Sequence, residues 1–190
     1  MSRRAFFTRW RDVAPPSTLP EPPRVAARPA IPFHRPPGAI EERAFLERCT
    51  RCGECATACP HDAIQEVAAR FGSAAKTPVI RPVESPCRMC ADTPCITACT
   101  VGALTKAIPI KMGLARINTM ECLAYQRQTC SVCYEQCPVA GAIRLEAGQP
   151  VVNADVCTGC GVCAYACPAP RNAIVLMPAA VRPGVEVHHG

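Results

Sequence analysis

The sequence has 190 residues, of which 16 are cysteine, 21 are proline and only 5% are aromatic, and its formal net charge is +6. A chain so poor in large apolar rings has little material for an ordinary core, so bound metal or cross-links must help to stabilise it. No stretch approaches the roughly 18 consecutive apolar residues of a membrane-spanning helix, which excludes a transmembrane segment.

Residues 1–40 form a basic, proline-rich arm. They contain nine prolines, seven arginines and two acidic residues, and so carry +5 of the net charge of +6. Proline at this density predicts an extended linker. Phe6, Trp10 and Val13 recur at helical spacing, so the start is either a disordered arginine-rich segment or a short amphipathic helix that docks on a partner or a membrane surface. The positive charge of the arm is modest, and beyond the first ten residues aromatic residues do not alternate with the basic ones. We therefore expect no nucleic-acid partner.

The first residues also resemble a twin-arginine export signal, because Arg3 and Arg4 are followed by Phe6 and Phe7. Such a signal needs an apolar run after the arginines, and charged residues and then prolines follow here instead. We therefore expect a cytoplasmic protein, in a reducing compartment that suits free thiolates.

Sixteen cysteines then form four motifs of four. Motifs one and four read C-x2-C-x2-C-x3-C-P, motif two reads C-x2-C-x4-C-x3-C, and motif three reads C-x7-C-x2-C-x3-C-P. In bacterial ferredoxins three consecutive cysteines of such a run bind one cluster, and the fourth ligates the neighbouring cluster. The sequence therefore predicts four [4Fe–4S] clusters. Their predicted iron ligands are Cys49, Cys52, Cys55, Cys59, Cys87, Cys90, Cys95, Cys99, Cys122, Cys130, Cys133, Cys137, Cys157, Cys160, Cys163 and Cys167.

Other uses of cysteine fit this spacing poorly. A disulfide framework needs facing partners, which three cysteines crowded into one short loop do not provide. Zinc ribbons pair two separated C-x2-C knuckles and do not repeat a triple cysteine followed by C-P. The C-x3-C-x2-C order of a radical-SAM loop is absent as well.

The motifs are embedded in an internal repeat. Each is followed by a short step of small residues ending on an aliphatic residue, at Ile64, Leu104, Ile143 and Ile174. Short β-like segments precede three of the motifs, at 79–81, 115–117 and 151–153. This alternation predicts an α+β fold with little regular secondary structure, built from two bacterial-type 2[4Fe–4S] ferredoxin-like modules after an extended arm. The expected boundaries are 41–110 for motifs one and two, 111–178 for motifs three and four, and 179–190 for a tail.

The sequence leaves open which motifs share clusters. The gaps between successive motifs are 27, 22 and 19 residues, and the shortest favours pairing three with four, which leaves one with two. Nested pairing, one with four and two with three, is the alternative.

A cluster with four cysteine ligands has no open coordination site, so its default role is one-electron transfer. The sequence contains no convincing catalytic constellation and no dinucleotide or phosphate loop. We therefore expect an electron carrier or accessory protein, not an enzyme, that exchanges electrons with redox protein partners.

The segment Cys87–Cys99 with Gly102-Ala103-Leu104, Lys111–Ala115 and Cys122-Leu-Ala-Tyr-Gln resembles the ferredoxin-type proteins of the NapF and NapG/MauM families. The resemblance spans about residues 41–178. It implies an electron carrier for a nitrate reductase-type system, with a molybdenum reductase catalytic subunit as a candidate partner and the arm as a candidate docking element. A NapF-like cytoplasmic assembly factor for that subunit, and a fixed electron-transfer subunit of a larger oxidoreductase, are the alternatives.

Overall fold

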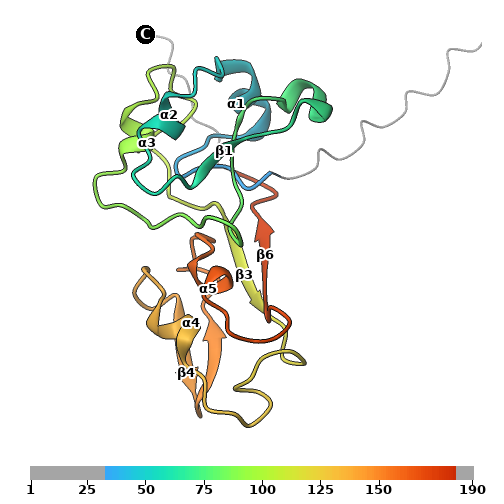
Figure 1. Ribbon diagram of the computed structural model, residues 1–190. Coiled ribbons are helices and arrows are strands. Elements are labelled where there is room, and N and C mark those ends of the chain that lie inside the picture. The colour runs from blue at the N-terminus through green and yellow to red at the C-terminus, as the bar shows by residue number, and fades with distance from the viewer. Residues whose placement is uncertain (1–32, 183–190) are drawn as a thin grey trace, which may run out of the picture. The chain divides into compact units, whose positions relative to one another are not determined.

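The computed structural model describes residues 33–182, in which short helices and two-stranded sheets are joined by loops (Figure 1). The expectation of an α+β chain with little regular secondary structure is confirmed. In chain order the elements are α1 (Glu42–Arg48), α2 (Glu54–Thr57), β1 (Ile64–Glu66), the 3-10 helix η1 (Ala69–Ala74), β2 (Pro78–Ile80), α3 (Pro94–Thr97), β3 (Gly113–Ile117), α4 (Val132–Glu135), β4 (Ile143–Glu146), β5 (Gln149–Val152), α5 (Val162–Tyr165) and β6 (Ile174–Pro178).

Several expectations concern residues outside this range. The export-like start, the helical spacing of Phe6, Trp10 and Val13, and most of the predicted arm and tail lie outside the described residues. Among the residues that are described, none of the helices has the length and apolar character needed to cross a membrane.

The same strand arrangement occurs twice along the chain. We call residues 39–105, which carry motifs one and two, the first module, and residues 113–178, which carry motifs three and four, the second module. In each, an antiparallel pair lies between the two motifs: β1 with β2 in the first module and β4 with β5 in the second. A second antiparallel pairing joins the two ends of each module, as the single bridge Ala39–Leu104 in the first and as β3 with β6 in the second. The predicted boundaries 41–110 and 111–178 stay a prediction, although the pairings follow the same division.

The aliphatic residue after each motif has the same structural role in all four repeats. Ile64, Ile143 and Ile174 each begin a strand, and Leu104 forms the isolated bridge. All four side chains are buried. The alanine directly before each of them is buried as well, which favours a small side chain at that position: Ala63, Ala103, Ala142 and Ala173.

Apolar residues and cysteines together make up two main cores. The first combines Phe45, Ile80 and Met112 with cysteines of motifs one and two, and the second combines Ile143 and Ile174 with cysteines of motifs three and four. Cys160 and Val162 of motif four belong to the first core, so the two modules share buried surface. The cysteines thus occupy positions that aliphatic side chains fill in an ordinary domain.

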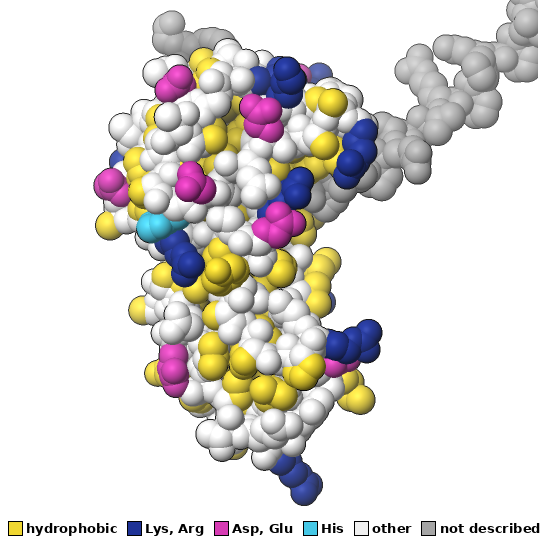
Figure 2. Space-filling view, in the orientation of Figure 1, with side chains coloured by type: hydrophobic (Ala, Val, Ile, Leu, Met, Phe, Trp, Pro, Cys, Tyr) yellow, Lys and Arg dark blue, Asp and Glu magenta, His cyan; other side chains and the backbone are white. Residues whose placement is uncertain are grey.

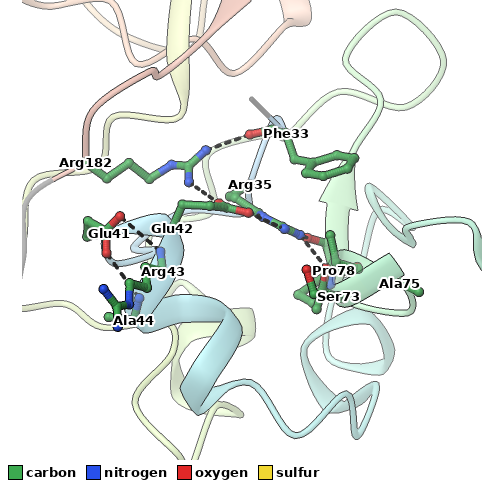
Figure 3. Close-up of polar contacts among 12 residues, drawn as sticks. Phe33, Arg35, Glu41, Glu42, Arg43, Ala44, Ser73, Ala75, Pro78 and Arg182 are labelled. Carbon is green, nitrogen blue, oxygen red and sulfur yellow. Dashed lines mark hydrogen bonds and ion pairs between the residues drawn. The ribbon is translucent and has the colours of Figure 1, made fainter. Parts of the chain in front are cut away.

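A network of charged side chains connects the two ends of the described chain (Figure 3). Arg35 donates to both carboxylate oxygens of Glu42, at 3.2 and 2.6 Å, and Glu42 lies in the first turn of α1. Arg182 donates to the same carboxylate at 2.7 Å and to the carbonyl oxygen of Phe33 at 2.6 Å. Residues 33–35 and residue 182 are therefore both held against α1.

Candidate metal centres

Each motif folds into a loop followed by a single helical turn. The third cysteine of each motif lies on that turn, on α2, α3, α4 and α5 respectively, and the fourth follows two residues after the turn ends. Gly53 and Gly161 precede α2 and α5 in left-handed conformation, with φ of 81° and 93°, which glycine adopts without steric cost. Gly159, between the first two cysteines of motif four, has positive φ as well.

The cysteines surround four cavities, and every cavity combines two motifs. Three cysteines come from one motif, and the fourth is the last cysteine of the other motif in the same module. Cavity I is lined by Cys49, Cys52, Cys55 and Cys99, and cavity II by Cys87, Cys90, Cys95 and Cys59. Cavity III is lined by Cys122, Cys130, Cys133 and Cys167, and cavity IV by Cys157, Cys160, Cys163 and Cys137. The structure thus brings together all sixteen predicted site residues, and it pairs motif one with two and three with four.

Burial and mutual repulsion both disfavour ionised sulfur in these cavities. Burial raises the pKa of Cys55 and of Cys163 to about 12, and neighbouring cysteines of the same cavity add to the increase. Burial raises the pKa of Cys133 to about 11, again with the other cysteines of its cavity contributing. A thiolate must be formed to ligate a metal, so positive charge within each cavity has to offset four neighbouring thiolates.

The donor set fits a cubane cluster. None of the sixteen cysteines, all of which lie within the described residues, forms a disulfide. Within residues 33–182, no three His, Cys, Asp or Glu side chains are close enough together to hold a single metal ion. Four sulfurs placed around an apolar space, instead of around one point, suit an iron–sulfur cluster better than a mononuclear zinc ion.

The four cavities differ in exposure. Cavity I contains Cys52, which is exposed, and its other three cysteines are half-buried. Cavity IV contains three buried cysteines, Cys157, Cys160 and Cys163. A group bound in cavity I therefore lies closest to solvent, and one bound in cavity IV is the best enclosed.

Charged side chains are also distributed unevenly among the cavities. Arg51, Glu66 and Lys76 line cavity I, and Arg88 lines cavity II together with His61. In the part of the chain that the structure describes, cavities III and IV have no charged side chain in their lining. Elsewhere on the face that Figure 2 presents, basic and acidic side chains are interspersed.

A backbone group contributes to cavity I as well. The N–H of Leu104 donates to Sγ of Cys99 at 3.3 Å. Such N–H to sulfur hydrogen bonds are among the features that set the potential of an iron–sulfur cluster.

Two pairs of cavities, each formed by two crossed cysteine motifs, define a ferredoxin-type iron–sulfur protein with four [4Fe–4S] clusters. Family models described as 4Fe-4S binding domain match residues 45–65, around motif one, and residues 148–169, around motif four.

Comparison with known proteins specifies the family. The chain is 40% identical over 172 residues to "Ferredoxin-type protein NapG" of Escherichia coli (strain K12), a match that covers 82% of this chain and 74% of that protein. It is 42% identical over 160 residues to "Methylamine utilization ferredoxin-type protein MauM" of Methylorubrum extorquens, covering 76% of this chain and 72% of the relative. "Ferredoxin-type protein NapF" of Escherichia coli is 32% identical over 138 residues, or 70% of this chain and 79% of that protein. The chain belongs to the NapG/MauM family of ferredoxin-type proteins, and the predicted resemblance is confirmed.

Several residues around the cavities are missed by reasoning from the sequence. Arg51 and Met89 each precede the second cysteine of a motif with positive φ, of 61° and 55°, at the place that Gly159 occupies in motif four. Aligning the motifs on their second cysteine would reveal that equivalence. No signal in the sequence identifies His34, whose Nε2 donates to the carbonyl oxygen of Gly159 at 2.6 Å from 125 residues away.

Proposed function

We propose that the sixteen cysteines ligate four [4Fe–4S] clusters, one in each cavity, and that the chain carries single electrons between redox proteins. The observation that supports this most strongly is that every cavity collects three cysteines from one motif and one from its partner. This three-plus-one exchange is the ligation pattern of two-cluster ferredoxins. We name the clusters I to IV after their cavities.

The bound clusters supply one-electron chemistry, and the chain's residues determine where it can happen. Four cysteines per cluster leave no position for a substrate at iron, which argues for a carrier and against an enzyme. The apolar lining, such as Ile117, Leu123 and Ala173 around cavity III, keeps water away from the sulfurs. Such enclosure lowers the local dielectric and so affects the potential of the bound group.

Cavity I is the best candidate for the end at which electrons are exchanged with a partner. It contains the exposed Cys52, and its lining includes two basic side chains, the exposed Arg51 and the half-buried Lys76, against one exposed acidic side chain, Glu66. Basic side chains around an exposed redox group favour the approach of an acidic surface on the partner.

For the physiological system we propose a nitrate reductase-type partner, with a molybdenum reductase catalytic subunit receiving or supplying electrons. The support is the 40% identity to NapG, and the similar identity to MauM makes an amine-oxidising system the first rival. The 32% identity to NapF supports a second candidate, an assembly factor that binds the immature reductase in the cytoplasm. Fast reduction of all clusters coupled to turnover of a reductase favours the carrier, tight binding to the apo-reductase favours the assembly factor, and co-purification in fixed stoichiometry favours a permanent subunit.

The cytoplasmic location and the docking role of the arm stay predictions. Deleting residues 1–32 tests the second of them. If the arm docks the partner, the truncated chain keeps its clusters and loses affinity for the reductase.

The ligand assignment is tested with double variants whose iron content depends on which motifs share a cluster. Cys52→Ala combined with Cys99→Ala changes two motifs but removes ligands only from cluster I, so one cluster of about four irons is lost or converted. The matched control, Cys52→Ala with Cys59→Ala, changes one motif but affects clusters I and II.

Iron and sulfide analysis with EPR spectroscopy of anaerobically purified protein distinguishes these outcomes. If the first double variant damaged two clusters and the control only one, each motif would hold its own cluster and the proposed assignment would be wrong. Wild-type protein without iron and acid-labile sulfide would contradict the proposed function itself.

A further inference from the structure

Three consecutive residues of motif two contact motif four. The backbone N–H of Cys87, in cavity II, donates to the carbonyl oxygen of Cys160, in cavity IV, at 3.1 Å. The hydroxyl of Thr158 lies 3.6 Å from the sulfur of Met89 and donates to it. Arg88 stands between Cys87 and Met89 in the chain, and its guanidinium carbon lies 5.5 Å from the ring centroid of Tyr165 on α5. The two modules therefore meet along the loops that enclose cavities II and IV.

Only glycine fits at two positions of motif four, and at one of them, Gly161, the residue that excludes a larger side chain belongs to the first module. A Cβ atom at Gly161 would overlap Pro82, and one at Gly159 would overlap the backbone of Gly113. Gly161 directly follows Cys160, so its close approach to Pro82 holds the carbonyl of Cys160 within reach of Cys87. The same segment is anchored from the other side, where the amide of Met112 donates to the carbonyl oxygen of Thr158 at 2.9 Å.

We propose that electrons pass between the two modules at the Cys87–Cys160 contact, so that the clusters work in the order I–II–IV–III. The proposal rests on the ligand assignment proposed above. In the crossing step one electron leaves cluster II and enters cluster IV, or the reverse, so one cluster is oxidised while the other is reduced and no bond is made or broken. The path runs from sulfur to sulfur through the two cysteine residues and one hydrogen bond.

The burial of clusters I and IV agrees with this order. Clusters I and II share the first module, and clusters IV and III share the second. Because electrons pass between the modules from II to IV, clusters I and III are the two ends of the series. Cluster I has the exposed Cys52, as an end that meets a partner requires, and cluster IV is enclosed by three buried cysteines, as an interior position requires. Electron transfer slows steeply with distance, so a displacement of the two loops should interrupt the series at its centre.

Gly161→Ala forces motif four away from Pro82 of the first module, and Gly53→Ala is its matched control. Both glycines directly follow the second cysteine of their motif and have a similar left-handed conformation, so both substitutions introduce the same backbone strain. The added methyl group overlaps Pro82 in Gly161→Ala, whereas in Gly53→Ala it finds nothing within 4 Å. The difference between the two variants therefore reports the separation of the modules.

The experiment measures magnetic interaction between clusters by EPR spectroscopy of the fully reduced full-length chain, alongside its iron content. The background is Cys52→Ala with Cys130→Ala, used once iron and sulfide analysis shows that clusters I and III are absent and not converted, so that the interaction that remains is the one between II and IV. We expect the interaction between clusters II and IV in the background protein and in the background protein that also carries Gly53→Ala. We expect its loss in the background protein that also carries Gly161→Ala. In the chain with all sixteen cysteines, Gly161→Ala should also slow equilibration of electrons between the modules after flash reduction.

Two results would overturn the proposed order. One is a background protein that retains two reducible clusters with no interaction between them. The other is a full-length Gly161→Ala protein that has its full iron content, is reduced reversibly and still equilibrates electrons between the modules at the wild-type rate. This second measurement also decides the question if the background protein fails to fold. Both results leave the proposed function intact, because the clusters are present and redox-active in each.

Discussion

The guanidinium of Arg35 and the carboxylate of Glu42 form an ion pair of 2.6 Å in which the arginine side chain is completely enclosed. Glu42 is also paired with Arg182 at 2.7 Å, so one carboxylate balances two buried cations. The rings of Phe33 and Phe45 lie 4.8 and 4.7 Å from the Arg35 guanidinium and attract its charge further. Since Phe45 also lines cavity I, this network supports the wall of a proposed cluster site.

Removing Glu42 should therefore destabilise the protein strongly. In Glu42→Gln two buried arginines lose their counter-charge, and breaking a pair of this kind costs about 3 kcal/mol or more. Anaerobic unfolding in guanidinium chloride, followed by loss of visible cluster absorbance, measures the change. In the control, Glu47→Gln, the broken pair with Arg43 has side chains that are 65% and 87% exposed, and we expect a change below about 0.5 kcal/mol. Equal losses in the two variants would show that the buried network adds nothing.

The order in which cysteines become reactive should follow the cavities and not the motifs. Under mild oxidation or chelation we expect cluster I to be lost first, because it has the exposed Cys52. Its loss frees Cys99 of motif two together with the first three cysteines of motif one, while Cys59 stays protected. Alkylation at successive times, with mass spectrometry of the peptides, identifies which thiols react together.

The cysteines of cavity IV supply the internal comparison for that experiment. Cys157, Cys160 and Cys163 are buried and should be modified last. Simultaneous labelling of Cys52 and Cys59, with Cys99 protected, would contradict the crossed arrangement.

Acid should weaken the fold through His34. Burial lowers the pKa of His34, the nearby charge of Arg182 lowers it further, and the hydrogen bond to Gly159 opposes both. The unfolded chain therefore takes up a proton near pH 6.5 that the folded chain still resists, so stability falls as the pH drops below about 6.5, by at most about 1.4 kcal/mol per pH unit. The loss ends once the pH reaches the lowered pKa of the folded state.

His34→Gln separates this effect from the acid sensitivity of the clusters. Glutamine can still donate to the Gly159 carbonyl but does not titrate in this range, so the variant should lose part of the decrease in unfolding midpoint between pH 7.5 and 5.5. His61→Gln, at an exposed position, is the control and should behave as the wild type does. A decrease of wild-type size in His34→Gln would assign the acid sensitivity to other groups.

The cysteine spacing predicts much of the site because its geometry is local. Three cysteines within a short loop and its helical turn converge whatever the rest of the chain does, as Cys157, Cys160 and Cys163 do. The aliphatic steps are predictable for the same reason, since Ile64 and Ile174 follow the last cysteine of their motifs by only five and seven residues. The pairing of motif three with motif four is favoured only weakly by the short gap before Cys157. Closing a longer loop costs little more free energy, so gap length does not decide which motifs share clusters.

Contacts between distant residues have no such local signal. Arg182 and Glu42 are 140 residues apart, and neither residue type normally indicates burial. The Cys87–Cys160 hydrogen bond joins backbone groups, which every residue possesses, so no side-chain pattern can reveal it. The positive φ of Arg51 and Met89 is missed because both are residue types that rarely adopt it.

The exchange of Cys59 and Cys99 between neighbouring cavities limits how such a chain can evolve. A gene segment encoding a single motif would leave one cage with three sulfurs and another with one, so neither could close. The smallest segment that can be duplicated or deleted without breaking a cluster site is therefore a whole module. Related proteins of different length should accordingly differ by eight cysteines at a time.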